Sequence, residues 1–163
     1  MPGLTLTDLT IVMLFLRWVH FVGGVAWIGT IFYLGMVQIP AMGKARSYAI
    51  SPEYVSKLNN VFIFTSISNV VAGVSIALVI SGLDSGVFTS TVWGLSILAG
   101  GLLALAALAT TFRGVIPAME RLSLGDLTDS ERLELFGRGR TWVNATMFLG
   151  TAVLLMMAAA GSL

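Results

Sequence analysis

The chain has no cysteine and only one histidine among its 163 residues. The absence of cysteine excludes disulfides, iron–sulfur clusters and thiolate metal sites. Charged residues make up 10% of the chain, against about 25% in a soluble domain. The net charge of +1 gives no indication of a nucleic-acid partner. Because 56% of the residues are hydrophobic and the mean hydropathy is +0.92, the composition predicts an integral membrane protein in contact with the lipid bilayer.

Four long runs are almost free of charge, and each reaches the roughly 20 apolar residues that a membrane-spanning helix needs. A β-barrel would instead show short segments of alternating hydrophobicity. The sequence therefore predicts an all-α fold, a four-transmembrane-helix up-down bundle that forms a single integral membrane domain over residues 1–163. The helices are expected at about 9–37, 58–83, 88–116 and 140–161.

The connections between these helices carry most of the polar residues. A separate amphipathic connector helix is expected at about 128–138, since Thr128 and Glu131 have the spacing of a capping box. Pro40 and Pro117 are expected to end or kink the first and third helices. The N-terminus lacks the basic region of a cleaved signal peptide, so Met1 is expected to start the mature chain.

Lysine and arginine are concentrated in two of the connections. These residues are Lys44, Arg46, Lys57, Arg113, Arg121, Arg132, Arg138 and Arg140. By the positive-inside rule, loops 38–57 and 113–140 are expected on the cytoplasmic side. Both termini are then expected in the periplasm, with the chain in a bacterial inner membrane.

The stretch RWVHFVGGVAWIG, from residue 17 to residue 29, contains the only histidine and the only charge of the first apolar run. Residues three, four and seven apart share a helix face, so Arg17, His20, Gly24 and Trp27 are expected on one stripe. Arg17 lies about 12 Å along the helix from Leu9, at ~1.5 Å per residue. No Asp or Glu lies in the four runs, so the charge of Arg17 must be met by a ligand, a lipid or another subunit.

Haem b would satisfy both polar residues of this stripe. A neutral imidazole at His20 is a metal ligand, and Arg17, one turn away, can pair with a propionate. Gly24 would let a flat macrocycle approach the backbone, and Trp27 would pack at its edge. The alternative is structural: His20 would hydrogen-bond a neighbouring helix, and the glycines would serve close helix packing.

The pattern R-W-x-H-x-x-x-G-x-x-W-I-G, followed by Phe32 and Tyr33, resembles the first helix of a group of small membrane bundles. The group includes the N-terminal membrane domain of PuuD-type urate oxidases, CopD-type copper-resistance proteins and HemJ-type protoporphyrinogen oxidases. For this chain the resemblance implies a haem b ligand with His20 as the metal-binding residue.

The fourth run carries a weaker part of the same resemblance. Arg140, Asn144 and the pair Met156–Met157 resemble an Arg-Asn-Met helix of the urate oxidase group. The segments RWVHFVGG and RTWVNATMFLG also resemble each other, which would give Asn144 in the fourth helix the place of His20 in the first. Asn144 and Met147 are therefore further candidate cofactor-binding residues.

This chain differs from the group because it offers no second histidine and no lysine within the helices. The iron could then be five-coordinate, could take a methionine, or could be shared by two chains that each give one histidine. The candidate methionines are Met13, Met36, Met147, Met156 and Met157, among which Met147 is favoured by its nearness to Asn144. A chlorophyll-type pigment, whose magnesium needs one axial ligand, and copper held by soft methionine sulfur are less favoured cofactors.

A polar band in the second run consists of Thr65, Ser66, Ser68 and Asn69. It either makes hydrogen bonds between helices or brings Asn69 to His20 or its ligand.

Two function classes follow. In the first, the chain is a b-type haem-binding membrane protein for electron transfer or haem handling, within a larger membrane complex or a homo-oligomer. In the second, it is a non-catalytic accessory subunit of a respiratory, photosynthetic or oxygenase complex. An enzyme acting alone is disfavoured, since almost no extramembrane region is present and no nucleophile–base pair is apparent.

Overall fold

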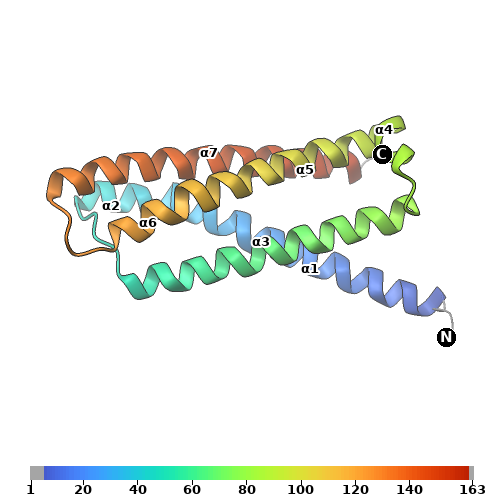
Figure 1. Cartoon of the computed structure of the whole chain (residues 1–163), viewed down its shortest axis with the longest axis horizontal. Coiled ribbons are helices and arrows are strands. Elements are labelled where there is room, and N and C mark those ends of the chain that lie inside the picture. The colour runs from blue at the N-terminus through green and yellow to red at the C-terminus, as the bar shows by residue number, and fades with distance from the viewer. Residues whose placement is uncertain (1–5, 162–163) are drawn as a thin grey trace.

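The computed structural model describes residues 6–161, and the described part of the chain contains helices and no strands (Figure 1). Four helical stretches are long and apolar enough to cross a membrane, which confirms the predicted all-α class: Asp8–Ala45, Pro52–Ser81, Val92–Leu122 and Asp129–Ala160. Their elements are α1 (Leu6–Tyr33), η1 (Leu34–Gln38), α2 (Ile39–Ala45), α3 (Pro52–Ser81), α4 (Ser85–Ser90), α5 (Val92–Thr110), η2 (Thr111–Val115), α6 (Ile116–Leu122) and α7 (Asp129–Gly161).

Of the two expected outcomes at Pro40 and Pro117, an end or a kink, the structure excludes an end at both. Each proline follows a five-residue π-helical turn, η1 or η2, and the helix then continues for about two turns as α2 or α6. Proline has no N–H to donate, and its ring would clash with the preceding turn of an α-helix. The wider π turn accommodates it: the N–H of the residue before the proline bonds five residues back, from Ile39 to Leu34 and from Ile116 to Thr111.

The predicted separate connector helix at 128–138 was wrong, because these residues form the first turns of the 33-residue α7. The capping box itself is present: Glu131 accepts hydrogen bonds from the backbone N–H of Thr128 (2.8 Å) and from its hydroxyl (2.7 Å). No proline separates the polar and apolar parts. Gly139 packs against Ala118 of α6, and this packing offsets the low helix propensity of glycine.

The structure contains an internal repeat that relates α1 to α5 rather than to α7. The elements η1, α2 and α3 begin at residues 34, 39 and 52, and η2, α6 and α7 each begin 77 residues later. The sequence Ile-Pro-Ala-Met starts both α2 and α6, and pairs of identical residues at this spacing include Gly23 with Gly100, Gly24 with Gly101, Leu58 with Leu135, and Gly73 with Gly150. The resemblance between the first and fourth runs therefore does not mark the repeat.

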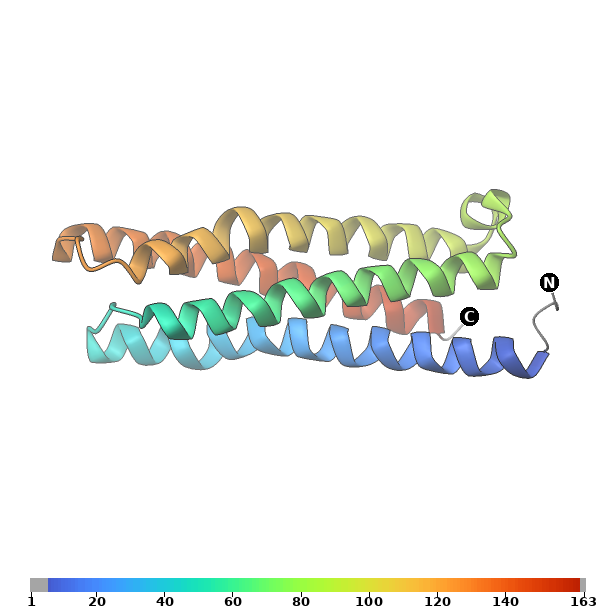
Figure 2. The same ribbon diagram turned by 60° about the horizontal axis from the view of Figure 1, so that its bottom comes forward.

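Each repeat forms a helical hairpin, and the two hairpins pack side by side (Figures 1 and 2). The first hairpin comprises α1, η1, α2 and α3, and the second comprises α5, η2, α6 and α7. Contacts between the two hairpins occur in pairs related by the 77-residue spacing. Asn59 donates a hydrogen bond to Glu120 (2.7 Å), and the residues 77 positions away from this pair, Phe136 and Gly43, also face each other. The bundle therefore has an approximate two-fold relation between its halves.

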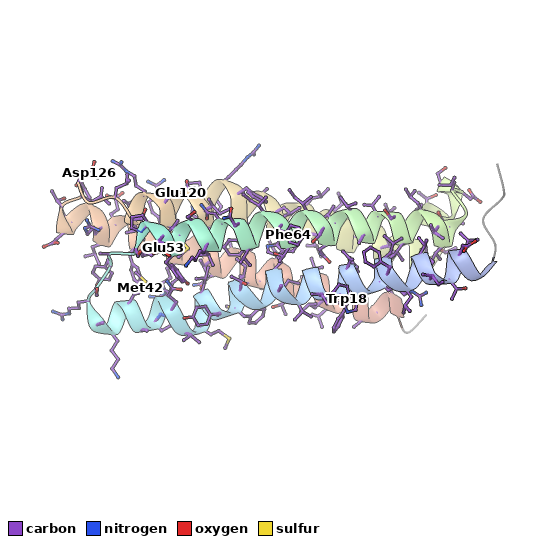
Figure 3. The ribbon with its side chains drawn as sticks, turned by 90° about the horizontal axis from the view of Figure 1, so that it is seen from below. Trp18, Met42, Glu53, Phe64, Glu120 and Asp126 are labelled. Carbon is purple, nitrogen blue, oxygen red and sulfur yellow. The ribbon has the colours of Figure 1, made fainter. Side chains whose placement is uncertain are left out.

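Most of the buried hydrophobic residues lie toward one end of the bundle. This loop end holds the connections 46–51 and 123–128; the terminal end holds Leu6 and Gly161. Figure 3 shows Met42, Glu53, Glu120 and Asp126 toward the loop end and Trp18 toward the other. The core residues are Trp27, Ile28, Ile31, Leu34, Val55, Leu58, Phe62, Ala107, Val115, Ile116, Met119 and Val143. Residues 8–22 of α1 include no buried side chain.

Candidate ligand site around His20

His20 lies where α1 crosses α3, and it contacts the backbone of Asn69. The distance from His20 Nδ1 to the carbonyl oxygen of Asn69 is 2.8 Å. A carbonyl oxygen can only accept, so Nδ1 carries the hydrogen. In a neutral imidazole the other ring nitrogen, Nε2, is then unprotonated and holds the lone pair that binds a metal. A hydrogen bond from the second nitrogen to a backbone carbonyl is the usual support of a metal-binding histidine.

Gly73, one helical turn beyond Asn69, makes room for the imidazole. A Cβ at Gly73 would lie 2.7 Å from His20 Cε1 and 3.0 Å from Nδ1, but 3.6 Å from Nε2. The edge of the ring that carries Nδ1 therefore faces α3, and Nε2 is the ring nitrogen farther from it. On α1, a Cβ at Gly23 would lie 3.0 Å from the carbonyl oxygen of Thr65. Glycine on both helices thus permits the close crossing that seats the histidine.

No hydrogen-bond partner of His20 Nε2 occurs within the described residues. The same part of the chain holds no cluster of three or more metal-ligating His, Cys, Asp or Glu side chains. Any metal at Nε2 would need its remaining ligands from a macrocycle, a methionine or another chain.

Arg17 lies one turn from His20 toward the terminal end, and its side chain is exposed. The one ion pair among residues 8–160 joins Lys57 and Glu53, so Arg17 has no carboxylate partner there. The repeat places Arg113 level with Met36, which is 19 residues or ~28 Å along the helix from Arg17. A bilayer core is about 30 Å thick. Arg17 and Arg113 can therefore lie at its two faces.

Two of the other predicted residues accompany His20. A Cβ at Gly24 would lie 3.2 Å from the side-chain oxygen of Asn69, a buried atom without a hydrogen-bond partner. Trp27 is 2% exposed and belongs to the core, and its indole N–H also has no partner. Arg17, His20, Gly24 and Trp27 all lie in the continuous helix α1, where steps of three and four residues keep them on one side.

Asn144 and Met147 are not brought to His20. Asn144 is exposed on α7. The sulfur of Met147 lies 3.2 Å from the position of a Cβ at Gly35, which is 15 residues or ~22 Å along the chain from His20. The contact between Asn69 and His20 was anticipated as one of two alternatives, but it is made by the backbone carbonyl of Asn69. Asn69 and Gly73 are four residues apart on one face of α3, and this spacing could have indicated where the imidazole of His20 packs.

Comparisons of the chain with protein-family models, with curated proteins and with solved structures found no match.

The residues around His20 fit a haem group by their chemistry. Nε2 carries no hydrogen and can give its lone pair to the iron. Arg17, one turn away, has no carboxylate partner among the described residues, and Gly24 has no side chain. Trp27 lines one of two small cavities of the described interior, but His20, Arg17 and Gly24 line neither, so the group would lie at the terminal end, where α1 is least covered.

Proposed function

We propose that this chain is a b-type haem-binding integral membrane protein that serves electron transfer or haem handling within a larger membrane complex. The observation that carries the proposal is the hydrogen bond from His20 Nδ1 to the Asn69 carbonyl. It fixes the ring orientation and the tautomer that a metal ligand requires. The helix-1 resemblance to the urate oxidase, CopD and HemJ group supports the same cofactor.

Each residue of the site has a distinct role in this proposal. His20 supplies the axial nitrogen, and Asn69 and Gly73 hold its ring in place. Arg17 would pair with a propionate near the membrane surface, and Gly24, which faces the side chain of Asn69, would add no side chain of its own beside the group. Bound haem supplies one-electron redox chemistry. The chain itself supplies binding, orientation and charge, which agrees with a carrier or a subunit better than with an enzyme acting alone.

The proposed location is a bacterial inner membrane with both termini on the periplasmic side. The support is the distribution of Lys and Arg, which by the positive-inside rule favours a cytoplasmic position for loops 38–57 and 113–140. Single cysteines at Ser85 and Ser130, probed with a membrane-impermeant thiol reagent, should label from opposite faces. Labelling of both from one face would contradict this topology.

The test of haem binding is the absorption spectrum of the purified protein. A Soret band and a reduced α-band of b type are expected in the wild type. Both should be lost in His20→Ala while the helical circular dichroism is retained. The matched control is Ser75→Ala, which should keep both bands because the Ser75 hydroxyl bonds only its own helix, at Val71. A colourless wild type with no tetrapyrrole in an acid–acetone extract would contradict the proposal.

A second candidate is a non-catalytic subunit of a membrane complex in which His20 is structural. The same hydrogen bond favours it, because a histidine bonded to a neighbouring helix can serve packing alone. In that case the protein is colourless and His20→Ala lowers its resistance to unfolding. A chlorophyll-type pigment, or less favourably copper, at Nε2 would be identified from the same extract or by metal analysis.

A further inference from the structure

Three residues of α7, seven positions apart, lie on one face of the helix: Val143, Gly150 and Met157. The first two contact α1. A methyl carbon of Val143 lies 3.3 Å from the position of a Cβ at Gly35, and a methyl carbon of Ile28 lies 3.6 Å from that of a Cβ at Gly150. This face of α7 is therefore directed toward α1.

The two contacts define the antiparallel register of α1 and α7. A step of seven residues along α7, from Val143 to Gly150, corresponds to a step of seven residues back from Gly35 in η1 to Ile28 in α1. Another seven residues along α7 reach Met157, and another seven back along α1 reach Phe21. Met157 is therefore level with Phe21, the neighbour of His20 in sequence.

The side chains at this level do not cover each other. Phe21 is 70% exposed and Met157 is 40% exposed, although Phe21 lies seven residues from Ile28 on the face of α1 that meets α7. Figure 1 shows α1 and α7 diverging toward the terminal end. Arg17 and Gly24 share this face of α1 with Phe21, since they lie four and three residues from it. At the level of His20, the facing surfaces of α1 and α7 thus carry the cation of Arg17, a glycine and the thioether of Met157.

We infer that Met157 is the second axial ligand of a haem held by His20 between α1 and α7; this inference rests on the proposed function. Neutral methionine sulfur and histidine nitrogen form a known pair of haem ligands, and methionine raises the reduction potential. Other methionines are less suitable. Met147 lies beside Gly35, which is ~22 Å along the helix from His20. Met13 belongs to the same helix as His20 and cannot reach the opposite side of a macrocycle. The Cβ of Met156 lies 3.4 Å from the position of a Cβ at Gly100 of α5, so Met156 is directed away from α1.

The experiment compares Met157→Leu with Met156→Leu in the full-length purified protein. Both changes nearly conserve volume, so neither is expected to unfold the bundle. In Met157→Leu the far-red sulfur-to-iron charge-transfer band of the ferric protein should disappear and the midpoint potential should fall. Met156→Leu should leave both unchanged. Met157→His should give a bis-histidine spectrum with one haem per chain, a gain that a merely structural residue would not produce.

The outcomes separate this inference from haem binding itself. An unchanged charge-transfer band and potential in Met157→Leu would overturn Met157 as the ligand and leave haem binding intact. So would a wild-type bis-histidine spectrum with one haem per two chains, which would mean that His20 of a second copy completes the site. A wild-type protein without tetrapyrrole would overturn both proposals.

Discussion

The two hairpins share the same element boundaries at a spacing of 77 residues, yet their helices pair in different registers. In the first hairpin, Gly23 of α1 packs against Asn69 of α3. The residues 77 positions later are Gly100 and Thr146, but Thr146 bonds instead to Thr110, ten residues or ~15 Å farther along the chain. The boundaries of the helices therefore do not determine how they pair; the side chains at the crossing do.

The register of the second hairpin is explained by one large side chain. The ring of Trp142 lies directly over Gly114, where a Cβ would overlap it. The corresponding residues of the first hairpin are Thr65 and Val37, which do not offer this complementarity. Because α7 is displaced toward the loop end, its last residues reach only the level of Arg17. The terminal part of α1 is therefore left beside α3 alone, and the candidate site occurs in one hairpin only.

The largest change in the free energy of unfolding is expected when the Trp142–Gly114 contact, which distinguishes the second hairpin from the first, is removed. Gly114→Val places two methyl groups where the Trp142 ring lies, and overpacking of this kind costs about 1–3 kcal/mol or more. The free energy of unfolding in mixed detergent micelles should fall accordingly. The double variant Gly114→Val with Trp142→Thr, which installs the pair of the first hairpin, should recover part of the loss. Gly101→Ala is the control, since nothing lies within 4 Å of a Cβ there.

If Gly114→Val is as stable as the wild type, the Trp142–Gly114 contact does not determine the register, and cross-linking of paired cysteines on α5 and α7 would be needed to find what does.

A second prediction compares the two glycines at one repeat position. In Gly73→Ala the new methyl group would lie 2.7 Å from His20 Cε1, so the imidazole must move and its bond to Asn69 is lost. Loss of a hydrogen bond costs about 0.5–1.5 kcal/mol, and haem retention should fall much more strongly than stability. In Gly150→Ala the nearest atom lies at 3.6 Å, an ordinary contact, and haem content should be unchanged. Equal haem content in the two variants, measured by pyridine haemochrome, would show that Gly73 does not seat His20.

The comparison also shows what the sequence could predict. The four spans follow from charge-free runs, because burying charge in lipid is costly wherever it occurs. The stripe of Arg17 and His20 follows from helical periodicity. The continuation of the helices past Pro40 and Pro117 could not be read from local rules, since a π turn depends on packing around it. Nor could the placement of Met147, because the register of α7 is determined by the distant contact between Trp142 and Gly114.

A smaller change in stability is expected when Asn69 is replaced by threonine, the residue at its counterpart in the second hairpin, Thr146. The His20 bond uses the backbone carbonyl of Asn69, so Asn69→Thr should preserve it. The side-chain oxygen of Asn69 is buried without a partner, and such an atom is a cost that the variant removes. Stability should therefore change by less than about 1 kcal/mol, and the spectrum should be retained. Loss of the bound cofactor in this variant would mean that the amide side chain itself contacts it.

The smallest effect is expected at Arg17, whose counterpart in the second hairpin is Gly94. Arg17 is exposed and has no carboxylate partner among the described residues, so its contact must be a haem propionate, a lipid phosphate or a group of another subunit. If it is a propionate, Arg17→Gln leaves that anion uncompensated. An uncompensated anion stabilises the more positive ferric state, and the midpoint potential falls. An exposed charge pair is worth about 0.2–1 kcal/mol, which corresponds to roughly 10–40 mV for a one-electron couple. Arg113→Gln, nearer the loop end of the bundle, is the matched control and should leave the potential unchanged. If Arg17→Gln does not change the potential either, Arg17 binds lipid or another subunit, and its three-residue spacing from His20 has no part in the site.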